Sequence, residues 1–273
     1  IFAVRIQKGE LAMVFFNLGG EVLNQQRQVL NTNVPEEVVG IIRSYFEWVI
    51  ENSQISREKV LWCGLATPGL INPHKGLLVR SSNLNWYNIP ISELLSTSLG
   101  GIPVRLEQNA NAAAIAEMEY GSGKGYSNLI YINLSVGISA GIIINGKIFN
   151  GEFGYAGEIG HTTFFPKNGP QCSCGRYGCF EASCGAHRVL ELIKAEVSQS
   201  LFEKYGMSKE KVTIEDVISS PLLETPQIRD ILKETGKMIG IAVANLLSLF
   251  NTSMIILGGE LAKVGDLLIR EII

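Results

Sequence analysis

The 273-residue sequence predicts a mixed α/β protein made of two similar lobes. Apolar runs of strand length alternate with helical patterns, and the same kinds of element, in a similar order, occur twice along the chain. Apolar residues make up 46% of the sequence, which allows a substantial core, and the length suits one large or two ordinary domains. No apolar run approaches the roughly 18 residues that a membrane span requires.

The first lobe is expected to span residues 1–120. Residues 1–29 contain three apolar runs separated by glycines, which predict three strands joined by short turns. Apolar residues recur at helical spacing over residues 36–52, directly after Pro35, which is a helix-start signal. The pattern then predicts a strand that runs into a Gly/Pro loop, a second strand and a helix: residues 61–71, 102–108 and 109–121.

The second lobe is expected to span residues 121–273. Asn145-Gly146 between two apolar runs predicts a hairpin, because this pair favours a tight type I′ turn. Residues 226–250 are apolar on most faces, which predicts a buried helix. In chain order this lobe is predicted to contain a strand, the hairpin, two helices and a strand: residues 128–135, 140–149, 181–205, 226–250 and 252–261.

Four potential metal ligands gather in residues 161–179 of this lobe. Cys172, Cys174 and Cys179 follow one another at short spacing, with glycines that allow a tight turn, and His161 precedes them by eleven positions. One histidine and three cysteines predict a zinc knuckle, and four protein ligands predict a structural Zn²⁺ rather than a catalytic one. The alternatives are that the cysteines are simply buried, or that two of them form a disulfide.

Two motifs resemble the signature of the ROK family, which comprises repressors, open reading frames and sugar kinases. They are G-E-I-G-H at residues 157–161 and C-x-C-G-x-x-G-C-x-E at residues 172–181. The resemblance implies that Glu158, His161 and Glu181 bind sugar hydroxyls. Carboxylates accept hydrogen bonds from hydroxyls, and an imidazole that binds zinc through one nitrogen has the other nitrogen free. Alternatively, the two carboxylates only orient the metal ligands.

The order of elements resembles the two-lobed ribonuclease H-like fold shared by actin and hexokinase-type ATPases. Kinases of the ROK family carry phosphate-binding turns, and this sequence departs from two of them. Residues 5–9 replace an Asp-x-Gly-Gly-Thr turn, so Arg5 and Lys8 either attract phosphate or are ordinary strand and turn residues. Within residues 134–141, Val136 replaces a threonine that would contact phosphate. The glycine pair at residues 258 and 259 does match the family's adenine-side turn.

Residues 107–112 resemble the family's Glu-Asn-Asp-Ala-Asn-Ala segment, and the catalytic aspartate falls on Asn109. An amide cannot act as a general base, a role worth about 10²–10⁴ in rate, so we expect no catalytic residue here. Asn109 and Gln108 can still bind sugar, and Asn109 can alternatively cap the helix after it. Residues 82–86 resemble a family sugar loop, which implies a contact from Asn83, although they also fit a simple connecting turn.

The resemblance is greatest to sugar-responsive transcriptional regulators of the xylose-repressor and N-acetylglucosamine-repressor type, with a degenerate kinase site. We therefore expect the sugar-binding effector domain of a repressor of sugar-utilisation genes, with a monosaccharide as effector. The resemblance implies a homodimer and a winged-helix domain, upstream of this chain, that binds operator DNA. The net charge of −3 does not indicate a nucleic-acid-binding face within this sequence.

The cysteine-rich metal motif favours a reducing compartment, so a cytoplasmic location is expected. The main alternative function is an ATP-dependent sugar kinase, similar to glucokinase or N-acetylglucosamine kinase, which would need ATP and Mg²⁺. A third alternative is a sugar-binding module without either activity. The sequence favours the regulator, because the departures from the family lie on the nucleotide and catalytic side.

Overall fold

The computed structural model describes residues 1–273, which form two compact units. Unit 1 comprises residues 1–112 and 150–156, and unit 2 comprises residues 113–149 and 157–273. The helix α3 (Asn109–Tyr120) contributes its first turn to unit 1 and the remainder to unit 2. The two units are therefore interleaved in the sequence.

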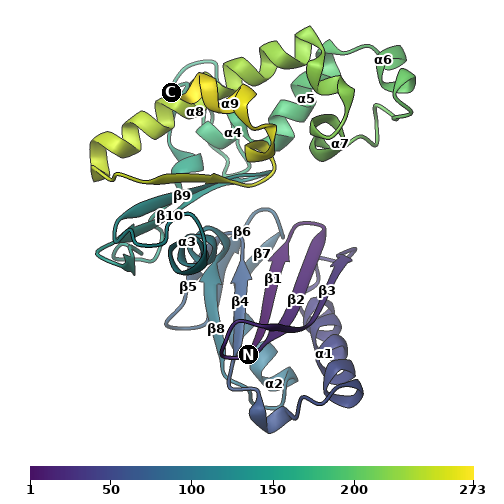
Figure 1. Cartoon of the computed structure of the whole chain (residues 1–273), viewed down its shortest axis with the longest axis vertical. Coiled ribbons are helices and arrows are strands. Elements are labelled where there is room, and N and C mark those ends of the chain that lie inside the picture. The colour runs from purple at the N-terminus through teal and green to yellow at the C-terminus, as the bar shows by residue number, and fades with distance from the viewer. The chain divides into compact units, whose positions relative to one another are not determined.

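Unit 1 is built on a five-stranded sheet with the strand order β3-β2-β1-β4-β8 (Figure 1). Strands β1, β2 and β3 form an antiparallel meander, and β4 and β8 run parallel to β1. The three strands predicted for the first 29 residues are confirmed. The strands of this sheet are β1 Phe2–Gln7, β2 Glu10–Phe16, β3 Val22–Val29, β4 Cys63–Thr67 and β8 Val104–Gln108.

The core of unit 1 forms where the helices α1 (Pro35–Asn52) and α2 (Ile91–Ser98) pack on this sheet. Alternate residues of β1 and β2 are buried, as expected for strands with one covered face. At the centre, the ring of Phe2 lies 4.5 Å from that of Phe15 and 5.3 Å from that of Phe46 between centroids.

A second sheet in unit 1 has three short strands that the sequence pattern did not reveal, in the order β5-β6-β7. The strand predicted to run into a Gly/Pro loop within residues 61–71 is confirmed as β4, which the chain leaves at Pro68 and Gly69, where Gly69 has a φ of +105°. The first strand of the second sheet follows directly. The strands of the second sheet are β5 Leu70–Asn72, β6 Leu77–Ser81 and β7 Trp86–Ile89, and a short 3₁₀ turn η1, Arg57–Lys59, precedes β4.

Unit 2 repeats the plan with a four-stranded sheet in the order β11-β10-β9-β12. The strands β9, β10 and β11 form an antiparallel meander, and β12 is parallel to β9, as β4 is to β1 in unit 1. The predicted repetition of elements is therefore confirmed at the level of strand order. The strands are β9 Leu129–Leu134, β10 Ile138–Ile144, β11 Lys147–Ile148 and β12 Ile255–Gly258.

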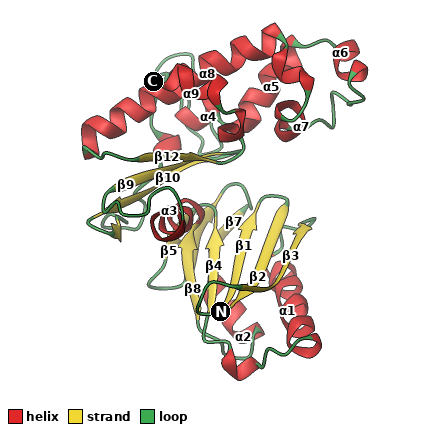
Figure 2. Cartoon of the chain, viewed as in Figure 1, coloured by secondary structure: helices red, strands yellow, loops and turns green.

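Both faces of the unit 2 sheet are covered. On one face, alternate residues of β9 and β10 pack against the long helices of this unit, and on the other face the second half of α3 contributes Ala114 and Met118 (Figure 2). The helices are α4 Phe180–Cys184, α5 Ala186–Glu196, α6 Gln199–Lys204, α7 Ile214–Ile218, α8 Pro226–Phe250 and α9 Asp266–Ile272. Three 3₁₀ turns complete the unit: η2 Ile159–His161, η3 Pro221–Glu224 and η4 Leu261–Val264.

Two helix predictions for this unit are wrong. The helix predicted over residues 181–205 is three helices, because Gly185 and Ser198 have extended backbones with ψ of 152° and 151°. The helix α8 has the predicted bounds but is not buried all round, since Ile241 and Leu249 are 54% and 77% exposed. None of the helices combines the length and apolar character that crossing a membrane would require.

The aromatic cluster of unit 1 generates a stability prediction. Replacing Phe46, which is fully buried, with alanine leaves a cavity among packed rings and should lower the free energy of unfolding by about 3–5 kcal/mol. The matched control is Trp48→Ala on the same helix, because Trp48 is 52% exposed and should change stability by at most about 1 kcal/mol. Urea denaturation followed by circular dichroism measures both, and equal losses would contradict the assignment of this core.

Candidate functional site

The G-E-I-G-H segment passes tightly against strand β10. Gly157 has a φ of +91°, and a Cβ atom there would lie 2.0 Å from the carbonyl oxygen of Ala140. A Cβ atom on Gly160 would lie 2.2 Å from the carbonyl oxygen of Ile138. Any larger residue at these two positions would push the segment away from β10. The glycines therefore fix where the intervening Glu158 and the following histidine lie.

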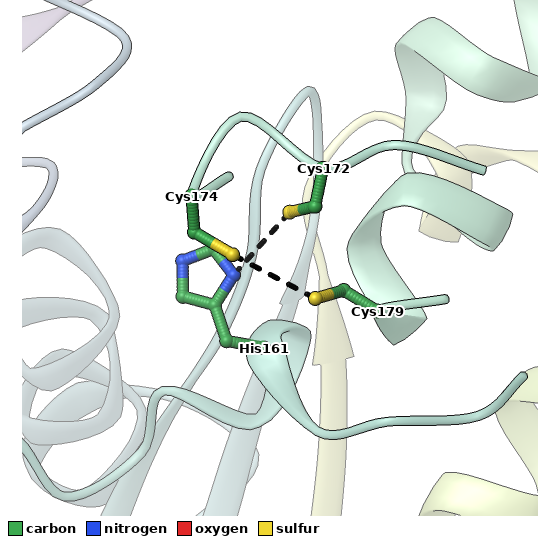
Figure 3. A group of neighbouring side chains, drawn as sticks. All are labelled: His161, Cys172, Cys174 and Cys179. Carbon is green, nitrogen blue, oxygen red and sulfur yellow. Dashed lines mark hydrogen bonds between the residues drawn. The ribbon is translucent and has the colours of Figure 1, made fainter. Parts of the chain in front are cut away.

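His161 and the three knuckle cysteines meet in one cluster (Figure 3). Their four ligand atoms all lie within 4.8 Å of one another. Cys172 Sγ is 3.6 Å from His161 Nδ1, and Cys174 Sγ is 3.7 Å from Cys179 Sγ. A tetrahedral zinc ion, with Zn–S of about 2.3 Å and Zn–N of about 2.0–2.1 Å, places its ligand atoms about 3.6–3.8 Å apart. The four groups fit a zinc site, and their side chains point inward from η2, the knuckle loop and the start of α4.

The disulfide alternative is excluded by the same distances. All five cysteines are free, and a disulfide would bring two sulfurs to about 2.05 Å. Cys63 is fully buried in β4, as predicted from its apolar strand. Cys184 is fully buried in α4 and is not a member of the metal-binding cluster, which agrees with its omission from the predicted ligand set.

The thiols of the cluster differ in acidity. Burial alone would raise the pKa of Cys174, but hydrogen bonds from the backbone and side chain of Arg176 and from the other two thiols lower it to about 7. Burial and hydrogen bonds from its own S–H to the two neighbouring sulfurs raise the pKa of Cys179 to about 12, and burial also raises the pKa of Cys172. Cys174 is therefore about half ionised at pH 7, whereas the other two thiols lose their protons when a metal binds.

The imidazole of His161 has a different neighbour on each nitrogen. Nδ1 faces Cys172, and Nε2 lies 3.7 Å from Glu158 Oε2. The carboxylate of Glu181 accepts hydrogen bonds from the backbone N–H of Ile138 at 3.0 Å and from Ser173 Oγ at 3.4 Å. Unit 2 thus brings together the three residues that the resemblance assigned to a sugar, directly beside the metal cluster. Glu181 is held both by the knuckle and by β10.

The three remaining predicted sugar contacts lie in unit 1. Gln108 ends β8 and Asn109 begins α3, whereas Asn83 is half-buried in the turn between β6 and β7. Trp86 anchors that turn, because it is 2% exposed and its Nε1 donates to the carbonyl of Asn33.

Asn109 Nδ2 donates to the carbonyl oxygen of Ile6 at 3.2 Å, which links α3 to the end of β1. Its Oδ1 is buried and has no hydrogen-bond partner within the protein. An N-cap side chain would accept a bond from the first turn of the helix, so the capping alternative is wrong. Asn109 therefore offers a buried acceptor rather than a cap.

The sequence interpretation missed a polar network at the start of α3. Asn111 Nδ2 donates to Glu107 Oε1 at 2.9 Å and to Asn150 Oδ1 at 3.2 Å. Within unit 1, this network connects Asn150 of the segment 150–156 to the start of α3. The signal for part of it was the spacing of four between Glu107 and Asn111, but nothing in the sequence placed Asn150 beside them.

The two loops that replace the kinase phosphate turns are internally bonded. The Arg5 guanidinium pairs with Glu10 across a tight β1–β2 hairpin, so Arg5 is a strand residue rather than a free cation. In the loop after β9, the backbone N–H of Ser135 donates to Gly137 O at 3.2 Å. The Val136 carbonyl lies 3.0 Å from Nδ1 of His187, a histidine for which the sequence gave no partner.

Comparison with known proteins places the whole chain in one sequence family. The model of the ROK family matches residues 1–273. A xylose repressor of Caldicellulosiruptor bescii is 29% identical over 95% of this chain. A glucokinase of Halalkalibacterium halodurans is 28% identical over 96% of this chain. The chain spans 65% of the length of that repressor and 80% of that glucokinase.

Solved structures of a transcriptional regulator and of a glucokinase share the fold of this chain. A ROK family transcriptional regulator, a homologue of the E. coli MLC protein, has a TM-score of 0.83 and 25% identity, covering 99% of this chain and 68% of its own. A ROK family glucokinase from Streptomyces griseus in complex with glucose and AMPPNP has a TM-score of 0.86 and 26% identity, covering 99% and 86%. The predicted actin- and hexokinase-type fold is confirmed.

The cluster predicts what happens when one ligand is lost. Cys174→Ala should reduce bound zinc from about one ion per chain to almost none and lower the thermal stability, because three ligands do not close a structural site. Cys184→Ala is the control, since this cysteine is buried outside the cluster. Metal content is measured by atomic emission on folded protein, and a full zinc load in Cys174→Ala would reject the ligand assignment.

The thiol acidities predict an order of chemical modification. In metal-free folded protein, the pKa of about 7 makes Cys174 largely a thiolate above neutral pH, whereas burial raises the pKa of Cys63 and Cys184 to about 12. Iodoacetamide should therefore label Cys174 first, with a rate that rises between about pH 6 and about pH 8, and bound zinc should prevent it. Peptide mass spectrometry locates the label, and preferential labelling of Cys63 or Cys184 would contradict this order.

Proposed function

Because the chain belongs to the ROK family, we propose that it is the sugar-binding effector domain of a transcriptional regulator of sugar-utilisation genes, with the kinase activity lost. Both repressors and glucokinases are among its relatives. The choice between them rests on the chemistry of the residues that this chain carries in the kinase positions.

One observation carries the proposal, and it is the hydrogen bond from Asn109 to Ile6 O. A carbonyl oxygen requires a donor, so the amide nitrogen faces it and the amide oxygen faces the other way. A carboxylate at this position would place an unprotonated oxygen against the carbonyl. The position is thus built for an amide, which binds hydroxyls but cannot remove their protons.

The two loops at the positions of the family's phosphate-binding turns also favour the loss of kinase activity. Phosphate-binding turns work through backbone N–H groups that face the ligand, and the N–H of Ser135 is instead bonded to Gly137 O. Arg5 is paired with Glu10 at the hairpin that replaces the first turn. The Ser135 N–H and the Arg5 side chain are therefore already engaged within their own loops.

The residues that the family resemblance assigns to sugar binding are all polar in this chain. We propose that a monosaccharide is bound by Glu158, His161 and Glu181 of unit 2, with further contacts from unit 1: Asn83, Gln108 and Asn109. A structural Zn²⁺ on His161 and the three cysteines would fix the ring of His161, so that Nε2 points away from the metal. The zinc therefore supports binding without taking part in chemistry.

The regulator reading extends to partners beyond this sequence. We propose a cytoplasmic homodimer whose operator DNA is bound by a winged-helix domain outside these residues. The chain spans 65% of the length of the xylose repressor that it resembles, which leaves room for such a domain in a protein of that kind. The sugar would act by binding one conformation of the protein better than another.

An ATP-dependent sugar kinase is the second candidate. It is favoured by the glucokinase relatives and by the Gly258-Gly259 turn at the end of β12, which matches the family's adenine-side turn. Under this reading ATP and Mg²⁺ would be cofactors. The missing base at Asn109 is the observation against it.

The two candidates predict different results with purified protein. We expect xylose, glucose or N-acetylglucosamine to raise the thermal midpoint, and sugar turnover in a coupled ATP assay to remain below about 1 s⁻¹, an ordinary enzymatic rate. Glu181→Gln should weaken sugar binding at least about tenfold, because a hydrogen bond to a charged group is worth about 1.5–3 kcal/mol. Glu191→Gln, on the exposed face of α5, is the control.

If the protein phosphorylates any of these sugars faster than about 1 s⁻¹, the kinase function would be accepted and the proposal of a regulator without kinase activity rejected. If none of them binds, as judged by calorimetry, the proposed sugar site itself would be rejected. Equal weakening by Glu181→Gln and Glu191→Gln would remove Glu181 from the site.

A further inference from the structure

Arg176 contacts three of the four residues of the metal cluster, although it is not itself a ligand. It lies in the knuckle loop between Cys174 and Cys179 and is exposed to solvent. Its Nη2 donates to the carbonyl oxygen of His161 at 2.8 Å, and its backbone oxygen accepts the N–H of Cys172 at 2.8 Å. The guanidinium and the thiol of Cys174, two positions earlier in the same loop, also interact favourably.

The charge of the cluster makes the position of this cation significant. Three thiolates and a neutral imidazole carry a charge of −3, so a bound dication leaves −1. The carboxylates of Glu158 and Glu181 lie beside the cluster and add further negative charge. The guanidinium of Arg176 approaches from the knuckle side and interacts favourably with all three sulfurs. It therefore offsets the excess negative charge that metal binding leaves behind.

The shape of the guanidinium suits a second task. Its donors lie in a planar fork, so one side chain can bond to two acceptors at once. Here the side chain starts in the knuckle, two residues after Cys174, and donates to the carbonyl of His161 at the end of η2. These two ligands belong to segments that are separated in the sequence. Arg176 thus joins the knuckle to the turn that carries the histidine ligand.

We propose that Arg176 is a positioning residue of the metal centre, which increases metal affinity by bonding to the backbone of His161 and so holding its positive charge beside the ligand cluster. This inference rests on the proposal that the cluster binds zinc, and it is independent of whether the protein is a regulator or a kinase. Partners of metal ligands of this kind typically change metal affinity by about 10–100-fold. The charge carries most of the effect, because it acts on all three thiolates.

The test measures zinc affinity by competition with a chromophoric chelator, on the full chain. Arg176→Ala and Arg176→Gln should each weaken zinc binding by about 10–100-fold, and Arg176→Lys, which keeps the charge, should stay within about threefold of the unchanged protein. Arg188→Ala is the matched control, because Arg188 is a surface arginine on α5 whose partner is Glu191. It should stay within about twofold.

Cobalt substitution separates a direct effect on the sulfur from a general loosening of the loop. Removing a positive charge from a thiolate makes it a better electron donor, so the sulfur-to-cobalt charge-transfer band should move to longer wavelength in Arg176→Ala and Arg176→Gln. A merely structural role would reduce the band's intensity without moving it. Should Arg176→Ala fail to fold, the comparison of Arg176→Gln with Arg176→Lys provides the same test.

Three results would overturn the proposal: zinc affinity of Arg176→Ala within twofold of the unchanged protein, equal losses in Arg176→Lys and Arg176→Ala, or an unmoved cobalt band. Failure of the zinc site itself would look different, because the unchanged protein would then bind neither zinc nor cobalt tightly.

Discussion

The meeting of His161 with three cysteine sulfurs is the constraint on which the functional part of this protein depends. Between β11 and α4 the chain contains no helix or strand longer than the three-residue turn η2. Such a segment has few regular hydrogen bonds to define its path. Its position comes from glycines that allow close approach to β10, and from four ligand atoms that lie within 4.8 Å of one another. A bound metal would join these pieces into one rigid unit.

The same constraint connects the metal to the groups proposed to bind sugar. His161 faces the cysteines with one nitrogen and Glu158 with the other, and Glu181 is bonded to Ser173 inside the knuckle. If a sugar binds to these groups, then metal and sugar must influence each other's affinity, because linkage between two sites is reciprocal. Arg176 would belong to this connection through its bond to the backbone of His161.

The duplicated frame keeps the two cores separate from the residues proposed to bind ligands. Both units use a meander followed by a parallel strand, and the functional residues lie at strand ends and in loops rather than in the sheets. Changing Asn109 or the loop after β9 therefore leaves the cores intact. The two cores are built from separate sets of buried residues.

The sequence by itself determined the fold class, the repeated strand order, the family and the four candidate metal ligands. These features depend on local periodicity and on short spacings, which are visible without the tertiary structure. It could not reveal the strands β5 to β7, because strands of three to five residues are defined by their partners more than by their own composition. It also treated residues 181–205 as one helix, since the extended backbones at Gly185 and Ser198 arise from tertiary bonds such as that from Ala186 N–H to Ser135 O.

Only the tertiary structure decided what the polar residues around the site contact. It showed that Asn109 donates to Ile6, which is 103 positions away, and does not cap its own helix. It placed Asn150 beside Asn111, and it showed that the guanidinium of Arg176 donates to the carbonyl of His161. The physical reason is the same in each case: a hydrogen bond between distant segments depends on where the cores place them, and no local pattern in the sequence encodes that position.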